Sequence, residues 1–187
     1  MSKETPGNQI YIFFDLDGVL ADFDRHAREQ NKYTEDGKVK WGELDHQWWA
    51  TMPAFFGAKK FYSAVRKLGK VKFLTAPVLG ADCFSGKAEW VQKFASRRGK
   101  YALMDLIICP AKDKYFLASP NHILVDDREK NIKEWVAAGG IGVLHKGDFA
   151  ATLKALELAV EKMAITKLRT DAPKMTAPKK ANRAPWV

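Results

Sequence analysis

The sequence predicts an α/β fold, a Rossmann-like three-layer α/β/α sandwich with a mainly parallel, five-stranded sheet. Short apolar runs of strand length alternate along the chain with longer segments whose apolar residues recur at helical spacing. Strands that are apolar almost throughout are typical of a parallel sheet covered by helices on both faces. The chain has 187 residues, of which 47% are hydrophobic and 28% charged, and this suits one globular domain with a proper core.

The expected elements follow in order along the chain. Residues 11–14 form the first apolar run, and the helical pattern of residues 59–68 leads into the second run. Residues 85–98 place Ala88, Val91 and Phe94 on one helical face, and residues 128–138 do the same with Ile132 and Trp135. The expected strands are 11–14, 70–74, 106–109, 123–125 and 142–144, and the expected helices are 59–68, 85–98, 128–138 and 149–163.

One segment interrupts the alternation. Between Asp17 and Thr75 lie 57 residues, which is too many for a simple crossover connection. The segment is rich in aromatic residues, namely Trp41, Trp48, Trp49, Phe55 and Phe56. We interpret it as a small helical cap over the carboxyl end of the first strand, where ligands bind in open α/β sheets. The alternative is that these rings only pack onto the main core.

The predicted domain spans residues 9–165, with a core of 9–22 and 58–165 and a cap of about 23–57. Residues 166–187 are expected to form a basic, proline-containing, disordered tail with six basic residues and one acidic residue. The net charge of +9 is concentrated there, so any contact with nucleic acid is expected through this tail alone.

The sequence also predicts where the protein resides. No apolar stretch approaches the roughly 20 residues that span a bilayer, and the polar start MSKETPGNQ lacks the apolar segment of a secretory signal. Cys83 and Cys109 have no metal-binding spacing. We therefore expect a reduced, cytoplasmic protein without a membrane partner.

Polar side chains stand at the ends of four predicted strands. Asp15 and Asp17 follow the first run, and Gly18 permits the tight turn that leaves the sheet. Because the carboxyl ends of parallel strands meet at one edge, we expect these side chains to gather there. The set consists of Asp15, Asp17, Thr75, Lys114, Asp126 and Asp127.

This set suits phosphoryl chemistry. Carboxylate oxygens suit Mg²⁺, one carboxylate can act as a nucleophile, and a hydroxyl and a lysine can hold phosphoryl oxygens. A second carboxylate two residues away can protonate the leaving oxygen and later activate water. The aspartates could instead be turn residues and helix caps, which is an even alternative for Asp127 taken alone. The spacing after Asp15 excludes an EF-hand.

The motifs "DLDGVLADF" (15–23), Thr75, "DK" (113–114) and "ILVDDR" (123–128) resemble the four motifs of the haloacid-dehalogenase-like phosphohydrolases. Within that superfamily, "PAFF" (53–56) and "EWV" (89–91) make the chain similar to the 5′(3′)-deoxyribonucleotidases. The similarity covers roughly residues 10–156.

The resemblance implies a role for each matching residue. Asp15 would be the nucleophile and Asp17 the general acid and base. Mg²⁺ would be held by Asp15, the backbone carbonyl of Asp17 and the Asp126–Asp127 pair, with Asp127 as the direct ligand. Thr75 and Lys114 would bind phosphate, and Phe23 and Trp41 would contact the nucleotide base, while Gly18 and Val19 complete the loop. The resemblance also implies a homodimer.

The favoured interpretation is a Mg²⁺-dependent phosphatase of nucleoside monophosphates that forms an aspartyl-phosphate. A polynucleotide 3′-phosphatase that acts on DNA ends would use the same chemistry, but it needs an open groove lined with Lys and Arg. A non-enzymatic phospho-ligand or Mg²⁺-binding module is a third alternative, and the presence of both Asp15 and Asp17 counts against it.

Overall fold

The computed structural model describes residues 9–171 and has a five-stranded sheet in which every strand pair is parallel. The strand order is β3-β2-β1-β4-β5, so the first strand lies in the centre. The strands are β1 (Tyr11–Phe14), β2 (Lys70–Thr75), β3 (Leu106–Ile108), β4 (His122–Asp126) and β5 (Ile141–Leu144). The predicted fold class is confirmed, and each strand lies within a residue or two of its expected position.

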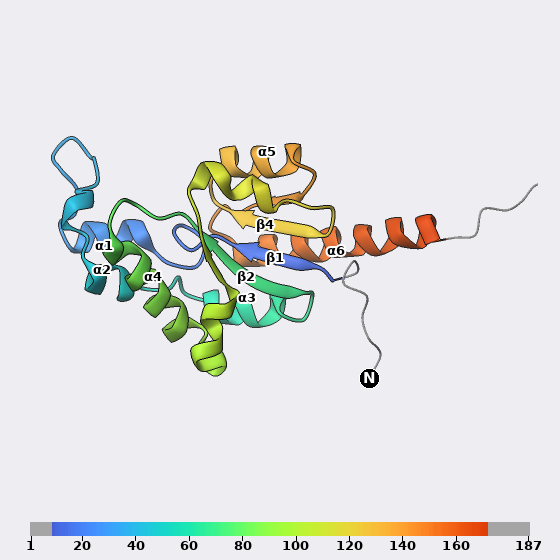
Figure 1. Ribbon diagram of the computed structural model, residues 1–187, viewed down its shortest axis with the longest axis horizontal. Helices are drawn as coiled ribbons and strands as arrows, with labels where there is room; N and C mark the ends of the chain where they lie inside the picture. The colour runs from blue at the N-terminus through green and yellow to red at the C-terminus, as the bar shows by residue number, and fades with distance from the viewer. Residues whose placement is uncertain (1–8, 172–187) are drawn as a thin grey trace, which may run out of the picture.

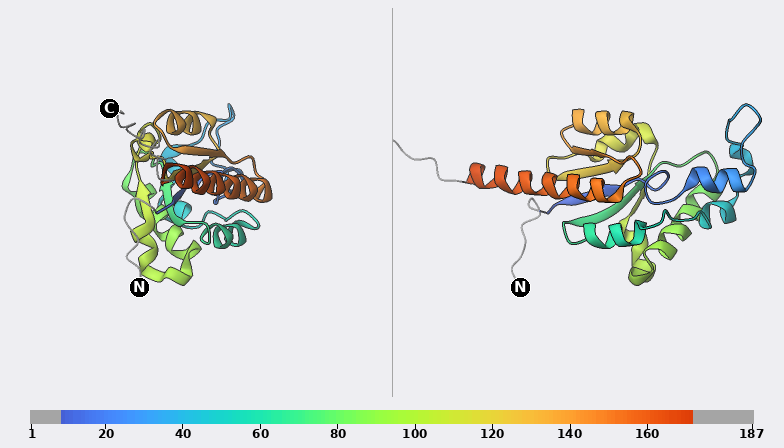
Figure 2. Two further views of the ribbon diagram at one scale, coloured as in Figure 1. Left: turned by 90° about the vertical axis from the view of Figure 1, so that its right-hand side faces the viewer. Right: turned by 180° about the vertical axis from the view of Figure 1, so that it is seen from behind.

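The α-helices of the described residues are α1 (Phe23–Glu29), α2 (His46–Ala50), α3 (Ala58–Val65), α4 (Ala81–Phe94), α5 (Glu129–Ala137) and α6 (Phe149–Asp171). Short 3₁₀ segments are η2 (Trp41–Glu43), η3 (Ser96–Asp105) and η4 (Ala111–Leu117). Helix α5 covers one face of the sheet, and α3 and α6 cover the other, so the molecule has three layers (Figures 1 and 2).

Alternation along each strand divides the core between these two faces. Ile12 and Phe14 of β1 point toward α3 and α6, where Phe61 and Leu156 are buried against them. Phe13 points the other way and packs with Leu124 and Trp135 of α5. Both faces of the central strand are therefore buried in the core. A shift of one residue would exchange the side chains of the two faces, so this burial fixes the register of β1 against β2 and β4.

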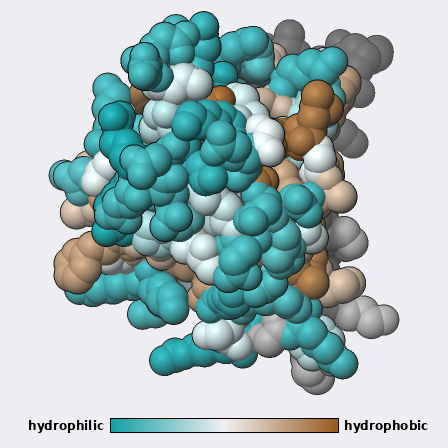
Figure 3. Space-filling model, turned by 90° about the vertical axis from the view of Figure 1, so that its left-hand side faces the viewer, coloured by the Kyte–Doolittle hydropathy of each residue, from teal (hydrophilic) through white to brown (hydrophobic). Residues whose placement is uncertain are grey.

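The segment between β1 and β2 forms the expected helical cap beyond the carboxyl ends of the strands (Figure 1). Asp45 caps the start of α2 by accepting from the Trp48 backbone N–H at 2.8 Å. Helix α2 then packs along α4, and a β-carbon at Gly86 would collide with the side chain of Trp49 and the backbone of His46. Seen from this end, the surface is mostly hydrophilic (Figure 3).

Three helices differ from the expected ranges. Helix α3 ends at Val65 rather than residue 68. Helix α4 begins at Ala81 rather than residue 85, so its first turns reach the cap and the strand ends, and it ends at Phe94 rather than residue 98. Helix α6 was expected to end at residue 163, but it continues to Asp171. The first residues of the expected tail thus extend this helix, and residues 172–187 lie outside the described part. In that described part, no helix is long and apolar enough to cross a membrane.

Candidate active site

The turn after β1 determines how the two aspartates are presented. The strand ends at Phe14, and the Leu16 carbonyl accepts the backbone N–H groups of Val19, Leu20 and Ala21. Gly18 has φ = 76°, a left-handed conformation that favours glycine. A β-carbon there would also collide with the Asp127 carboxylate. The turn therefore brings the loop after β1 against the end of β4.

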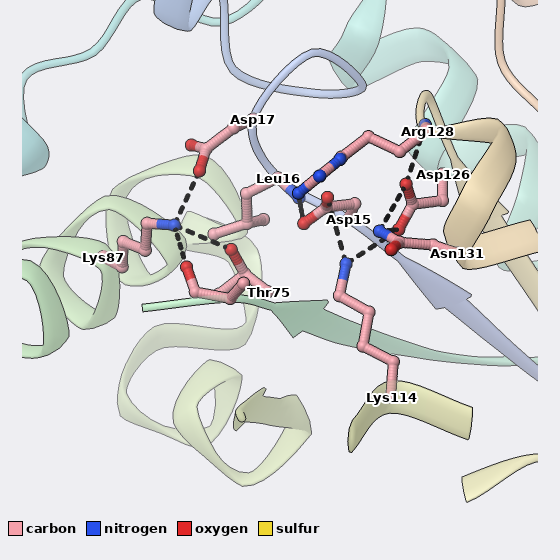
Figure 4. Close-up of polar contacts among 10 residues, drawn as sticks. Asp15, Leu16, Asp17, Thr75, Lys87, Lys114, Asp126, Arg128 and Asn131 are labelled. Carbon is pink, nitrogen blue, oxygen red and sulfur yellow. Dashed lines mark hydrogen bonds and ion pairs between the residues drawn. The ribbon is translucent and has the colours of Figure 1, made fainter. Parts of the chain in front are cut away.

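Asp15 belongs to a buried charge cluster with Lys114 and Asp126. The Lys114 ammonium lies 3.0 Å from Asp15 Oδ2 and 2.7 Å from Asp126 Oδ2. Asp15 Oδ1 accepts the Leu16 N–H at 2.8 Å. All three side chains are almost fully buried, so their charges act in a medium that screens weakly. The lysine from η4 thus joins the ends of β1 and β4 (Figure 4).

Asp126 is held from several directions. Its two oxygens accept from Asn131 Nδ2 at 3.0 and 2.9 Å, and Oδ1 also accepts the Arg128 N–H at 2.9 Å. Together with Lys114, these donors occupy the four lone-pair positions of the carboxylate. Asp126 therefore serves to fix the geometry of the cluster.

Asp127 differs from its neighbour because it is exposed. Oxygen atoms of Asp15, Asp126 and Asp127 lie within 4.8 Å of one another, close enough to ligate one metal ion. Although the residue is exposed as a whole, its carboxylate packs against Gly18, and this partial desolvation together with the nearby Asp126 charge raises the pKa of Asp127 to about 6. Burial also raises the pKa of Asp15, to about 7. The Lys114 ammonium lowers this pKa and the Asp126 charge raises it. Three carboxylates thus surround a single ammonium, and a cation would relieve their repulsion.

Lys114 retains its charge in this setting. Burial by itself lowers the pKa of a lysine, but the Asp15 and Asp126 carboxylates outweigh that effect and raise the pKa of Lys114. Its ammonium is therefore a permanent cation at the base of the site.

A second polar set lies beside the first and is centred on Lys87 of α4 (Figure 4). Its Nζ lies 2.6 Å from Asp17 Oδ2, and it donates to Thr75 Oγ1 at 2.9 Å and to the Ala76 carbonyl at 2.6 Å. The side chain is only 1% exposed, and the ammonium lies 4.9 Å from the centre of the Trp49 ring. Lys87 thus ties the cap, the end of β2 and Asp17 together.

A cleft of about 510 Å³ opens over both sets. Asp15, Asp17 and Lys87 line its floor, and Phe23 and Trp41 line the cap side. Phe23 is half-buried, with its ring 5.8 Å from Trp41 and 5.2 Å from Trp48, while Trp41 is 49% exposed. Phe23 therefore packs in the cap and also faces the cleft.

The predicted residues assemble at one edge of the sheet, in two sets rather than one. Asp15, Lys114, Asp126 and Asp127 form the first set, and Asp17 and Thr75 the second. Among the described residues, the group of carboxylates that can share a metal does not include Asp17, whose carboxylate lies against Lys87 instead. Its predicted metal contact is through the backbone carbonyl.

Lys87 and Asn131 were not anticipated from the sequence. Lys87 occupies the buried stripe of α4 between Cys83 and Trp90, and a lysine on an apolar helical face is the signal that could have identified it. Asn131 is buried on α5 at helical spacing from Trp135, a similar but weaker signal.

No protein-family model matches the chain, and no curated protein matches it. Among solved structures, it is similar to the HAD domain of the effector protein Lem4 from Legionella pneumophila, with a TM-score of 0.43 and 15% sequence identity. The alignment covers 83% of this chain and 97% of that chain. A likeness of this size says nothing about activity, so function has to be inferred from the residues of the site.

Proposed function

We propose that the protein is a Mg²⁺-dependent phosphatase that hydrolyses nucleoside monophosphates through an aspartyl-phosphate on Asp15. The observation that carries this proposal is the position of Asp15, which lines a cleft with Asp17 beside it and with the carboxylates of Asp126 and Asp127 close enough to share one cation with it.

The residues fit a hard divalent cation. The donor set of Asp15, Asp126 and Asp127 consists of oxygens only, as Mg²⁺ prefers. Asp126 is saturated by its own donors, so Asp127 and Asp15 would hold the ion directly, with the Asp17 carbonyl. When bound, the ion would neutralise phosphate oxygens and orient the phosphoryl group for attack.

The remaining residues divide the chemistry between them. Asp15 Oδ attacks phosphorus, and the bond from phosphorus to the ester oxygen breaks. Asp17 donates a proton to the leaving oxygen and then takes one from the water that hydrolyses the acyl phosphate. Lys114 and the Thr75 hydroxyl would hold phosphoryl oxygens during both steps. Lys87 positions Asp17 through the 2.6 Å ion pair.

The lining of the cleft favours a single nucleotide over a DNA end. Its charged residues are five aspartates and two cations, and this would repel a strand that carries several phosphates. Its cap side offers the Phe23 and Trp41 rings, against which a base can stack. The cleft volume of about 510 Å³ is within the range of small-molecule sites.

Phosphate release from a substrate panel tests the proposal. The panel contains ribo- and deoxyribonucleoside 5′- and 3′-monophosphates, an oligonucleotide with a 3′-phosphate, and a small synthetic phosphomonoester. Nucleoside monophosphates should give the highest kcat/KM, and activity should vanish in excess chelator and return with Mg²⁺.

The variant Asp15→Asn serves as the chemical control. A carboxamide retains the shape but is not a nucleophile, so turnover should fall by about 10³-fold or more. Retention of activity within tenfold would exclude Asp15 as the nucleophile. Preference for the oligonucleotide would favour the polynucleotide 3′-phosphatase instead.

A further inference from the structure

A strongly basic groove lies away from the candidate active site, lined by residues of α3 and of the junction between α4 and η3. Figures 1 and 2 show where α3 and α4 lie relative to the sheet. It has a volume of about 410 Å³, and half of the residues that line it carry a positive charge. These cations are Lys59, Arg66, Lys67, Arg97 and Arg98. None of the described residues that line it is acidic.

A second hollow of about 350 Å³ continues the groove toward the cap. The two share Lys59 and Phe94 as lining residues, and the second adds Lys93. Ala54 lines this hollow, and its neighbour Phe55 lines the catalytic cleft, so a single segment of the chain separates the two sites.

The distribution of charge along the sequence explains this surface. Residues 46–81 contain six lysines and arginines and no acidic residue, and residues 90–104 contain four and none. Helix α3 and the end of α4 bring both stretches to the same side of the sheet. Repulsion between like charges raises the energy of the folded state, and a bound polyanion would relieve it.

Few of these cations have partners among residues 9–171. Arg98 pairs with Asp105 at 2.7 Å, and Lys93 pairs with Glu89 at 2.5 Å. Lys59, Lys67 and Arg97 form no ion pair within that range, and the Arg66 guanidinium lies 5.7 Å from the centre of the Tyr62 ring. The unpaired side chains are exposed and therefore free to meet phosphates.

The shape of the groove suits an extended polyanion. Lys59 and Arg66 are seven residues apart on or just beyond α3, which corresponds to about 10 Å along a helix axis. Successive phosphates of one strand advance by about 3.4 Å along a duplex axis, so about three of them match this length. Tyr62 and Phe94 pack against each other at the bottom of the groove. Both rings are nearly buried, so bases cannot stack on them.

We infer that this groove binds the phosphodiester backbone of nucleic acid without reading its sequence. The site is separate from the cleft and goes beyond the proposed phosphatase activity. It also differs from the sequence-based expectation, in which only the tail could contact nucleic acid.

Fluorescence anisotropy with a labelled 20-nucleotide single strand, and with the matching duplex, over a salt series tests the inference on the full chain. The groove variant carries Lys59→Gln and Lys67→Gln. The control variant carries Lys130→Gln and Lys133→Gln on α5, which are also exposed, pair with glutamates of the same helix and change the net charge equally. Because the basic tail is present in both variants, it contributes equally to both.

Each phosphate contact contributes about 0.7 to the slope of log K against log salt for a single strand. The groove variant should therefore bind more weakly and lose about 1.4 from that slope, and the control should match the unmodified protein. Adding Arg66→Gln and Arg97→Gln to the groove variant should reduce the affinity and the salt slope further. Phosphate release from nucleoside monophosphates should be unchanged in all of them, so this test is independent of the proposed catalysis.

Equal salt slopes in the groove and control variants would overturn the inference. Displacement of the oligonucleotide by inorganic phosphate at constant ionic strength would also overturn it, because the groove would then be a pocket for a small anion. The inference would also be overturned if the unmodified protein did not bind the oligonucleotide.

Discussion

Phe23 contributes to the cap core and to the wall of the cleft at the same time. Its ring contacts Trp48 and Trp41, and it faces the space above Asp15. Base stacking on an aromatic side chain contributes about 1–3 kcal/mol. In the proposed enzyme, selectivity for nucleotides over other phosphomonoesters would come from contacts of this kind, because residues that bind only the phosphate do not contact the sugar or the base.

Replacing this ring should therefore affect substrates unequally. Phe23→Ala should lower kcat/KM for nucleoside monophosphates by roughly 5- to 150-fold, the kinetic equivalent of the stacking energy. A small synthetic phosphomonoester should be affected much less. Trp41→Ala, at a more exposed ring, should show the same pattern more weakly. Equal losses on both substrate types would mean that the rings only support the fold.

Lys87 offers a second test at the scale of one residue. Lys87→Met keeps the length of the side chain but removes the ammonium that holds Asp17 Oδ2, Thr75 and the Ala76 carbonyl. General acid–base catalysis contributes about 10²–10⁴-fold, so a misplaced Asp17 should lower kcat by at least about tenfold while KM changes little.

Lys93→Met is the matched control, because it lies on the same helix with its side chain exposed. It should leave both kinetic constants unchanged. A rise in KM with unchanged kcat for Lys87→Met would instead show that this lysine binds substrate. Melting temperatures of both variants separate either effect from loss of the fold.

The turn after β1 is the element that places Asp15, and Gly18 is its most constrained residue. Gly18→Ala faces a left-handed backbone and a collision with Asp127, whereas Gly37→Ala faces the backbone penalty alone, with φ = 80° and open space around it. Both substitutions should lower the free energy of unfolding by about 1–2 kcal/mol. Only Gly18→Ala should reduce phosphate release, by at least about tenfold, since it displaces a proposed metal ligand.

Denaturant unfolding and phosphate release measured on both variants check this expectation. Full activity in Gly18→Ala would show that Asp127 can move without consequence for the site.

The helices and strands also show what the sequence could predict. Strand β1 and the parallel arrangement of the sheet were predictable because the strand residues are apolar on both faces. The aspartates at the sheet edge were predictable because they directly follow such strands. The position of α4 was harder to predict from the sequence, because Lys87 interrupts its apolar stripe and Gly86 lies in the contact with α2. The roles of Lys87 and Asn131 depend on neighbours distant in the chain, such as Asp17 and Asp126, which no local pattern reveals.

At the scale of the whole molecule, the carboxylates of Asp15, Asp126 and Asp127 lie close together at the ends of β1 and β4, and their mutual repulsion destabilises the folded state. A cation bound there should stabilise the folded protein and not the unfolded chain, by about 2.7 kcal/mol at 100 times its dissociation constant. For a domain of this size, the melting temperature should rise by several degrees.

Thermal unfolding with and without Mg²⁺, at constant ionic strength, measures this rise. Asp127→Asn should reduce it, and Asp36→Asn, an exposed residue in the cap, should not. A melting temperature that is unaffected by Mg²⁺ at millimolar concentration would contradict the proposed metal site.

The central position of β1 has a consequence for the order in which the protein can fold during synthesis. This strand leaves the ribosome first, but its partners β2 and β4 follow about 60 and about 110 residues later. Long-range pairing of this kind requires closure of long loops and is slow. Until β4 has emerged, the apolar residues of β1 lack one neighbour, and Asp15 lacks both Lys114 and Asp126. The proposed nucleophile Asp15 is therefore synthesised before Lys114 and Asp126, the two residues that complete its surroundings.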